Sequence, residues 1–135
     1  MADITVTAAN VVPASGYQYI DGTAGATITA GQTVYLDSSV STYKLADANA
    51  SAAASSTVGI ALNGAAASQP IRVMTGGTLG FGAVLTKGTV YVQSATAGGI
   101  APVSDLASGW YRVTLGIATS TSNLAVKVHN SGVTD

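Results

Sequence analysis

Hydrophobic and polar residues alternate along several short stretches of this chain, and small or turn-forming residues separate the stretches. The clearest alternations are Thr33 to Asp37, Thr89 to Gln93, Trp110 to Leu115 and Leu124 to His129. Alternation with a period of two residues is typical of strands that bury one face of a sheet. Because no stretch sustains a helical period, the pattern predicts an all-β fold, either a compact sandwich or a small barrel.

Further strands are expected in the N-terminal half. Tyr17 to Ile20 is expected to form a strand that ends in a tight turn at Asp21-Gly22, because this dipeptide supplies the positive φ that hairpin turns need. Val58 to Leu62 and Pro70 to Thr75 are expected to be two strands joined through a turn at Asn63-Gly64.

Two stretches do not look like strands. Ala46 to Thr57 is rich in Ala and has capping candidates, so we expect a surface excursion that contains a short helix or turn. Gly76 to Gly82 is expected to be a flexible crossover between two halves of the domain. It is not a phosphate-binding loop, because it lacks the Gly-Lys-Ser/Thr ending of such loops.

The chain contains an internal repeat. Val58 to Gly77 reappears in altered form as Leu115 to Gly132, and each copy contains Gly-Ile-Ala followed by a strand with one central cation, Arg72 or Lys127. Two copies are too few for a solenoid. We therefore expect one compact domain built from two duplicated halves, about residues 27–77 and 84–132, related by pseudo-two-fold symmetry.

The repeat extends upstream of these segments. Thr29 to Leu36 aligns with Thr86 to Val92 when one residue is dropped, and this alignment matches Tyr35 with Tyr91. A symmetric pair of tyrosines is more simply explained by packing than by ligand binding, since aromatic residues serve in cores and interfaces alike.

The first residues stand outside the repeat. Asp3 to Val12 alternates at Ile4 and Val6, which predicts either a first strand of the domain or an arm that pairs with a neighbouring chain. The position outside the repeat favours the arm. We expect an extended N-terminal arm or edge strand over residues 1–15 and a single β domain over residues 16–135.

The composition of the chain limits the kinds of partner that it is expected to bind. The chain has 135 residues, of which 47% are hydrophobic and 8% are charged, with a net charge of -1. Ordinary soluble proteins carry about 25% charged residues, so a surface this poor in charge is expected to be covered in part by other protein. The cations form no basic stripe, which argues against nucleic-acid binding, and no stretch is apolar for long enough to suggest a membrane span.

The candidates for chemistry are few. His129 is the single histidine and is expected to be a surface or strand-end residue. The acidic residues show no spacing typical of a metal loop or an acid/base pair; they are Asp3, Asp21, Asp37, Asp47, Asp105 and Asp135. The chain has no cysteine. We therefore expect a protein that is not an enzyme and that uses no metal or cofactor.

Four segments follow one another in a recognisable order: Ala2 to Val11, Thr29 to Asp37, Val58 to Leu62 and Gln69 to Val73. An extended N-terminal segment precedes a Val-Tyr-Leu-Asp strand, an Ala-rich excursion, a Val-Gly-Ile-Ala strand and a Val-rich strand. In this order they resemble the capsid decoration, or cement, proteins of tailed bacteriophages. The resemblance covers essentially the whole chain.

The resemblance implies a structural virion protein, commonly trimeric, on the outer surface of the mature capsid. It implies binding at three-fold or quasi-three-fold positions, stabilisation of the head against internal DNA pressure, and synthesis in the host cytoplasm. The implied partners are the major capsid protein and other copies of the chain. The alternative is a head-fibre or adhesin-type module that binds a host receptor or carbohydrate through tyrosines and Trp110.

The arm is the expected site of capsid contact, because an extended segment can add a strand to the edge of another sheet. The expected contact residues are Asp3, Ile4, Thr5, Val6, Thr7, Val11 and Val12. Removing Met1 to Val12 is then expected to leave a folded body that no longer holds the capsid. Scarce charge also predicts that attachment depends only weakly on salt.

Overall fold

A computed structural model describes residues 3–134 and shows a fold made mostly of strands. The strands are β1 (Val12–Pro13), β2 (Gln18–Thr23), β3 (Thr33–Asp37), β4 (Thr42–Leu45), β5 (Thr57–Ala61), β6 (Pro70–Gly80), β7 (Val90–Gln93), β8 (Ile100–Pro102), β9 (Tyr111–Ala118) and β10 (Asn123–Thr134). Helical structure is limited to η1 (Ala8–Asn10), α1 (Ala52–Ser55) and η2 (Val103–Asp105). The predicted all-β class is confirmed.

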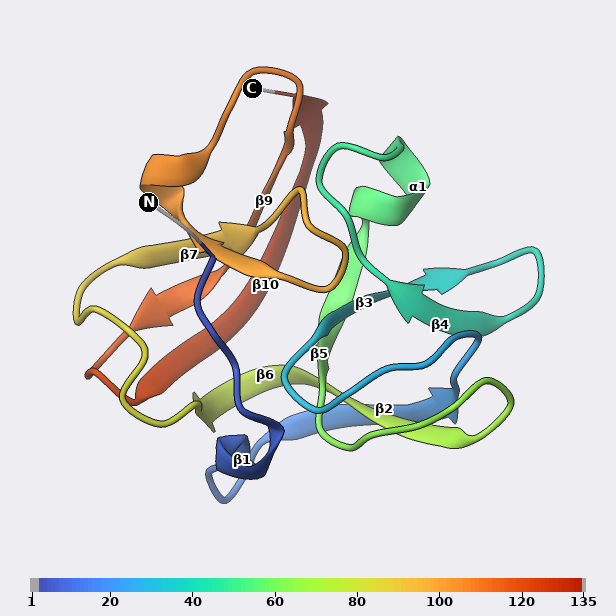
Figure 1. The fold of residues 1–135 in the computed structure, drawn as a ribbon, viewed down its shortest axis with the longest axis horizontal. Helices are drawn as coiled ribbons and strands as arrows, with labels where there is room; N and C mark the ends of the chain where they lie inside the picture. Colours follow the sequence, from blue (N-terminus) through green and yellow to red (C-terminus); the bar gives the residue numbers. More distant parts are fainter. Residues whose placement is uncertain (1–2, 135) are drawn as a thin grey trace.

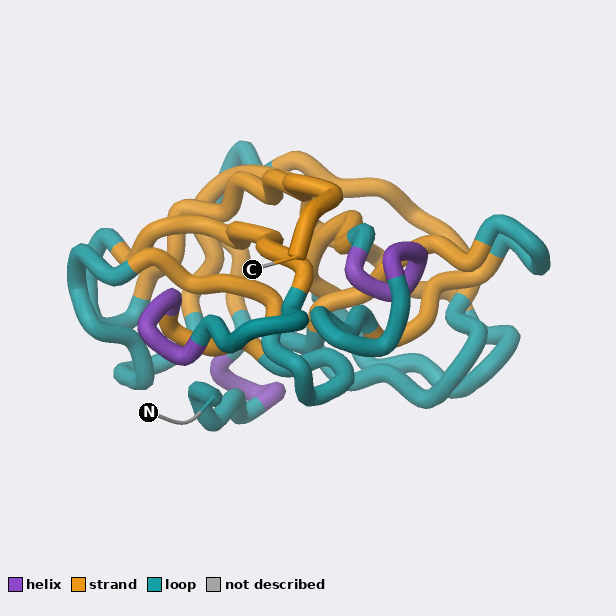
Figure 2. The backbone as a smooth tube through the Cα atoms, turned by 90° about the horizontal axis from the view of Figure 1, so that it is seen from above, coloured by secondary structure: helices purple, strands orange, loops and turns teal. Residues whose placement is uncertain are grey.

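All ten strands belong to one antiparallel sheet that curls into a half-barrel (Figure 1). The strand order is β4-β3-β5-β6-β10-β9-β7-β8, and β1 and β2 also pair with β6. The strands form an arch, while loops and the N-terminal segment lie on its open side (Figure 2). β6 is therefore the strand that joins the N-terminal and C-terminal parts of the sheet.

Most strands predicted from alternation are present. Thr33 to Asp37 is β3, and the other alternating stretches lie in β7, β9 and β10. Val58 to Ala61 lies in β5 and Pro70 to Thr75 begins β6. The prediction missed β8, whose Ile100 and Ala101 are both buried. A strand buried on both faces does not alternate, so its pattern gives little signal.

The predicted turn at Asp21-Gly22 is wrong. β2 continues through both residues, which pair with Arg72 and Ile71 of β6. A Cβ on Gly22 would overlap the ring of Tyr43. The glycine is thus needed for close packing of an aromatic ring against the strand rather than for a positive φ.

The predicted flexible crossover at Gly76 to Gly82 is also wrong over most of its length. β6 continues through Gly80, and Leu79 is completely buried. Gly77 has a φ of 113°, and a Cβ there would lie 3.0 Å from the Cα of Tyr17. The absence of a side chain at Gly77 lets Tyr17 approach β6 closely, while β6 keeps pairing with β10.

The Ala-rich excursion contains one helical turn. Ser51 caps α1 by accepting a hydrogen bond from the backbone N–H of Ala54 (3.1 Å). The excursion is docked more firmly than expected, because Ala46, Ala48 and Ala54 are buried. None of the helices within residues 3–134 has the length and apolar character needed to cross a membrane.

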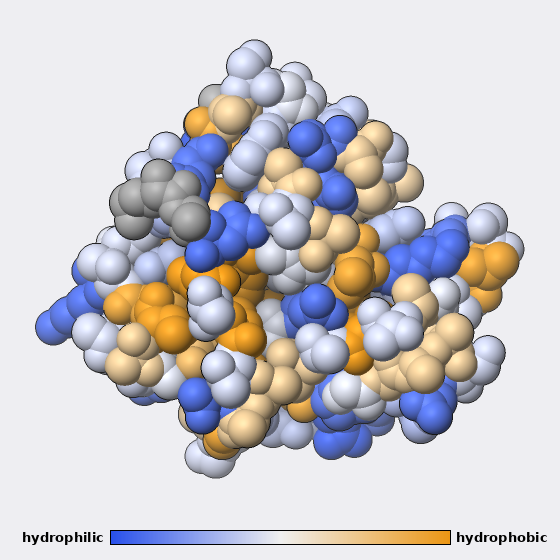
Figure 3. Space-filling view, in the orientation of Figure 1, coloured by the Kyte–Doolittle hydropathy of each residue, from blue (hydrophilic) through white to orange (hydrophobic). Residues whose placement is uncertain are grey.

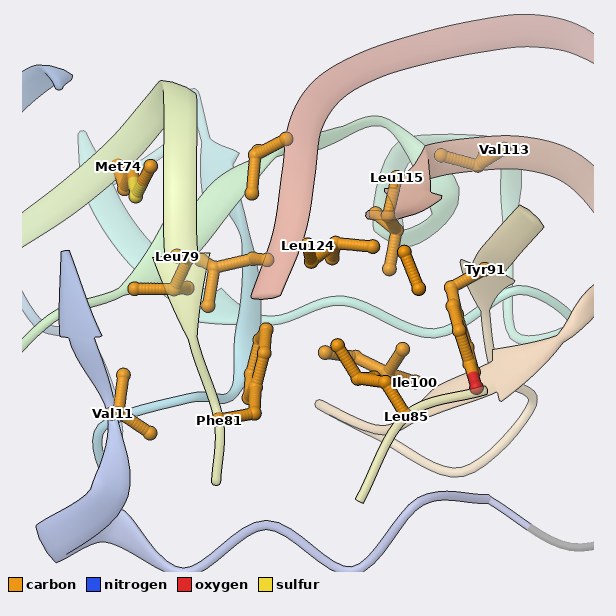
Figure 4. Packing of buried hydrophobic residues seen from close by; sticks show 13 residues of the cluster. Val11, Met74, Leu79, Phe81, Leu85, Tyr91, Ile100, Val113, Leu115 and Leu124 are labelled. Atoms are coloured by element: carbon orange, nitrogen blue, oxygen red, sulfur yellow. The ribbon is translucent and has the colours of Figure 1, made fainter. Parts of the chain in front are cut away.

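Two hydrophobic clusters are built on the sheet, and at β5 they lie on opposite faces, because Ile60 belongs to the larger cluster and the next residue, Ala61, to the smaller one. The larger one is shown in Figure 4 and is built around the completely buried Leu79, Phe81, Leu115 and Leu124. Val11 reaches this cluster from the N-terminal segment. The smaller cluster consists of Ala24, Ile28, Val34, Tyr43, Ala61, Ala65, Ile71 and Val73.

A buried amide ties the two parts of the sheet together. Gln93 of β7 is completely buried, and its Nε2 donates to the carbonyls of Ala46 (2.9 Å), Ser94 (3.1 Å) and Gly99 (3.2 Å). Its Oε1 accepts from the Thr57 hydroxyl (3.3 Å) at the start of β5. Buried polar groups are retained at low cost only when they are satisfied in this way.

Replacing this amide by an apolar side chain should be destabilising. Gln93→Leu removes all the hydrogen bonds of a completely buried amide. The Thr57 hydroxyl still donates to the Ser55 carbonyl (3.2 Å), and the three carbonyls keep their backbone partners. We therefore expect the free energy of unfolding to fall by about 1–3 kcal/mol. Urea unfolding followed by circular dichroism measures this. Gln18→Leu, on an exposed part of β2, is the matched control and should change stability by less than about 0.5 kcal/mol. Equal midpoints for the two variants would contradict the role of Gln93.

Candidate interaction surfaces

The N-terminal segment, which contains the predicted capsid-contact residues, lies against the body of its own chain. The backbone N–H of Ile4 donates to the carbonyl of Ile100 (2.9 Å), and both carboxylate oxygens of Asp3 lie 2.8 Å from the Ser94 hydroxyl. The predicted strand at Ile4 and Val6 does not form, and from residue 3 onward the segment contains only the short strand β1, which pairs with the end of β6.

Three apolar side chains of this segment point inward. Val11 is buried, and Ile4 and Val6 are partly buried against the larger cluster. Gly31 has a φ of 92°, and the position of its missing Cβ is occupied by methyl groups of Val6 and Val11. The structure therefore uses these three side chains within the chain itself.

The remaining predicted contact residues point outward. Thr5 and Thr7 are exposed, and Val12 is 61% exposed on β1. Of the seven residues predicted to touch a capsid, only these three present their side chains to solvent while the segment stays docked.

The tip of the β3–β4 hairpin, residues 36–41, presents two apolar side chains to solvent. Leu36 is 44% and Val40 58% exposed. Asp37 rigidifies the tip: its carboxylate accepts from the Ser39 backbone N–H (3.1 Å), the Ser39 hydroxyl (2.6 Å) and the Lys44 ammonium (2.7 Å). These bonds, with that from Lys44 the strongest, lower the pKa of Asp37 to about 2.

A groove of about 570 Å³ lies over β7, β9 and β10. Ile117 lines it and is 50% exposed, whereas the next residue, Ala118, is buried in the cluster. The lining residues are mostly apolar and include one lysine and no carboxylate; they are Val90, Thr114, Gly116, Ile117, Ala125, Lys127, Val128 and His129. The groove suits an apolar partner better than a polar small molecule.

An exposed ion pair lies across β2 and β6. The Arg72 guanidinium donates to both carboxylate oxygens of Asp21 (2.8 and 3.1 Å) and stacks 3.9 Å from the ring centre of Tyr19. The hydrogen bond from Arg72 lowers the pKa of Asp21, and the bonds to Asp21 and Tyr17 raise the pKa of Arg72. Because both charges are exposed, the pair orders this surface more than it stabilises the fold.

The residues considered for chemistry stay apart. His129 is exposed on β10, as expected for a surface residue, although it lies within the strand rather than at its end. Within residues 3–134, no group of three histidine or acidic side chains is placed to hold a metal ion. A polar hollow near Trp110 contains Asp3 and Asp105 together with the hydroxyls of Ser94 and Ser104.

The sequence signals for these surfaces were uneven. The apolar positions Ile4, Val6 and Val11 were visible in the alternation, but not that their own chain covers them. The tip and the groove were missed, since nothing in the local sequence distinguishes exposed Val40 or Ile117 from buried residues of the same type.

Comparison with known proteins adds no relative. No family model matches the chain, and no curated protein shows a significant match. Its function is therefore argued from its residues and their arrangement.

Proposed function

We propose that this chain is a structural virion protein that binds the outer surface of a mature tailed-phage capsid as a trimer, at three-fold or quasi-three-fold positions. It would stabilise the head there against the pressure of the packaged DNA. Its partners would be the major capsid protein and further copies of itself. The starting point is the resemblance to capsid decoration proteins.

Three of the four segments that carry this resemblance lie side by side in the sheet, which supports the resemblance. Thr33 to Asp37 is β3, Val58 to Ala61 lies in β5, and Pro70 to Val73 begins β6. These three strands are consecutive neighbours in the sheet. The resemblance thus involves one continuous part of the sheet rather than unrelated loops.

The observation that carries the proposal is the character of the surface. Only 8% of the residues are charged, and several large apolar side chains are exposed at separate places; they are Val12, Tyr19, Ile20, Leu36, Val40, Ile117 and Val133. A single exposed apolar residue needs no explanation. This number on a weakly charged body suits a protein that is covered on more than one side by other subunits.

We also propose that the two halves of the fold arose by duplication, which the strand order supports. Exchanging β3, β4, β5 and β6 for β7, β8, β9 and β10 turns the order of the eight-strand path into its own reverse. A pseudo-two-fold axis between β6 and β10 requires this property. An approximate axis within one chain would let a protein offer two related surfaces to its neighbours.

Individual hydrogen bonds support the duplication as well. Gly31 N–H donates to Ala61 O (2.8 Å), and 57 residues later Gly88 N–H donates to Ala118 O (2.7 Å). Both glycines have positive φ, 92° and 84°. A turn that is closed in the same way before β3 and before β7 is difficult to explain by composition alone.

From the turn before β3 to the end of β5, the strand register supports an alignment without a gap. Val34 pairs with Gly59, and 57 residues later Tyr91 pairs with Gly116, with a bulge after each pair. This alignment matches Tyr91 with Val34 rather than with Tyr35, so the dropped residue is unnecessary.

The same register changes the match between the cations. Ala61 pairs with Val73, and Ala118 pairs with Leu124. Arg72 then corresponds to Asn123, one residue before Leu124, and the predicted equivalence of Arg72 with Lys127 is not supported by the strand pairing.

Sedimentation with capsids tests the proposed function. The full-length protein is incubated with mature and with immature empty heads of the phage that encodes it, and the pellets are analysed. We expect saturable binding to mature heads that changes less than about twofold between ~50 and ~500 mM NaCl, because little Coulomb energy is involved. Absence of binding to heads of every maturation state would refute the proposal, and binding that collapses at moderate salt would refute its weakly charged interface.

A second candidate function is recognition of a host carbohydrate, and the hollow at Trp110 favours it. Trp110 lies at a hollow whose lining is otherwise mostly polar, and an aromatic ring beside polar groups is a surface on which a sugar ring can stack. Reproducible glycan-array signals that Trp110→Ala abolishes, together with no affinity for capsids, would favour this function over capsid decoration.

A further inference from the structure

The groove over β7, β9 and β10 and the tip of the β3–β4 hairpin lie toward opposite ends of the long axis of the molecule (Figures 1 and 2). Figure 3 shows hydrophobic side chains exposed at the right-hand end, over the connection between β3 and β4. The chain thus has an apolar protrusion at one end and an apolar depression toward the other.

The groove is open at positions whose counterparts in the other half are covered. Ile117 corresponds to Ile60 at the offset of 57 residues, yet Ile117 is 50% exposed and Ile60 is completely buried. Strand pairing matches Ala125 with Met74, because Ala125 pairs with Ile117 and Met74 pairs with Ile60. Met74 is also completely buried. In the N-terminal half both counterparts, Ile60 and Met74, belong to the larger cluster of this same chain.

The C-terminal half lacks such a cover within residues 3–134, so its Ile117 face remains in contact with solvent. A face that the chain buries against itself in one half is suited in the other half to burial against another copy of the same chain. The partner surface that could cover the Ile117 face is therefore expected to consist of apolar side chains on a strand or hairpin.

The hairpin tip has the properties of a docking element. Leu36 and Val40 are exposed, while three hydrogen bonds to the Asp37 carboxylate and one from the Val40 N–H to the Asp37 carbonyl (3.3 Å) hold the backbone in place. A preorganised element loses little conformational entropy on binding. Its charges are paired internally, so it can enter an apolar groove without an unpartnered carboxylate.

The charges at the two surfaces favour contact between unlike surfaces. Lys127 lines the groove, which has no carboxylate in its lining. A two-fold contact of groove with groove would therefore bring Lys127 near its own copy. The hairpin tip brings no unpaired cation to the groove, because Lys44 of the hairpin is paired with Asp37.

We propose that the tip of the β3–β4 hairpin of one copy docks in the groove of the next copy, with Leu36 and Val40 packed against Val90 and Ile117. This head-to-tail contact deepens the proposed function and rests on its oligomeric part. A contact between two different surfaces forms a ring when its rotation closes, and a closed ring of three copies has the symmetry of the three-fold positions on a capsid.

Engineered cysteines test the contact directly, because the natural chain has none. Val40→Cys and Ile117→Cys are purified separately and oxidised alone and as a mixture. A disulfide needs Cα atoms within about 7 Å, so we expect a cross-linked dimer in the mixture and none in either variant alone. Cross-linking of Val40→Cys with itself would overturn the head-to-tail contact.

Sedimentation velocity supplies a second, independent readout. Val40→Asp and Ile117→Asp place a charge on the tip and in the groove, and each should weaken self-association of the full chain by at least about tenfold. A mixture of the two variants should form a dimer and nothing larger, since one intact tip meets one intact groove. Val133→Asp, at a residue 62% exposed near the end of β10, is the matched control and should associate like the natural chain.

A natural chain that stays monomeric, or aspartate variants that associate as the control does, would overturn the contact. These measurements use no capsids, so their failure is distinct from that of the proposed function. A monomer that still sediments with mature heads would refute the head-to-tail contact alone. An intact ring that ignores heads would refute capsid decoration alone.

Discussion

Removal of residues 1–12 should lower the free energy of unfolding by about 3–6 kcal/mol, much of the total stability of an ordinary domain. The truncation deletes Val11 from the larger cluster, removes the partial cover provided by Ile4 and Val6, and breaks the contact of Asp3 with Ser94. Urea unfolding followed by circular dichroism measures the loss. The packing therefore adds a loss of stability to the expected loss of capsid binding.

Single substitutions show whether the loss of stability comes from the packing of particular side chains or from shortening the chain. Val11→Ala should cost about 1–3 kcal/mol, because it leaves a cavity beside the larger cluster. Thr5→Ala and Thr7→Ala change exposed residues of the same segment and should stay within about 0.5 kcal/mol of the natural chain. A truncated protein with an unchanged unfolding midpoint would show that the segment only rests on the surface.

The outcome bears on how the segment could contact a capsid. If it stays docked, only Thr5, Thr7 and Val12 of the predicted contact residues are exposed to a capsid. If it detaches to add a strand elsewhere, the new contacts must replace the burial of Val11 and the hydrogen bond of Ile4. The second route therefore has a free-energy cost that the sequence alone did not reveal.

Strands with one buried face were predictable, and strands set by tertiary contacts were not. β3, β7 and β10 alternate because neighbouring side chains point to opposite faces of the sheet. β8 is too short and too uniformly buried to alternate. At Gly22 the turn propensity of Asp-Gly is overridden by tertiary contacts, because six residues of β2 pair with β6 and the Tyr43 ring packs against the glycine.

The candidate sites depended even more on tertiary structure. That His129 and the dispersed aspartates do not form a catalytic group could be argued from spacing alone. The exposed Val40 and Ile117 could not be found in this way, because exposure depends on what the remainder of the chain covers. The duplication was visible in the Gly-Ile-Ala repeats, but its register required the strand pairings at Gly59 and Gly116.

Substitution of Gly59 or Gly116 is the second change for which we expect a large loss of stability. A Cβ on Gly59 would overlap the carbonyl oxygen of Met74, and a Cβ on Gly116 would overlap that of Ala125. Each clash is with the backbone of the adjacent strand, which cannot move without breaking its pairing. Gly59→Ala and Gly116→Ala should therefore each destabilise the fold by about 3 kcal/mol or more, at the upper end of the cost of overpacking.

Gly64→Ala is the control for this prediction. Gly64 does not have a positive φ, and its added Cβ would lie 3.7 Å from the Ile28 carbonyl oxygen, an ordinary contact. It should therefore change the urea midpoint little. Similar large losses at Gly59 and Gly116 would mean that both halves require the same close approach of two strands, as a duplicated structure would. A large loss at one glycine and tolerance at the other would mean that the halves have diverged in this feature, which would weaken the case that their registers descend from one ancestral unit.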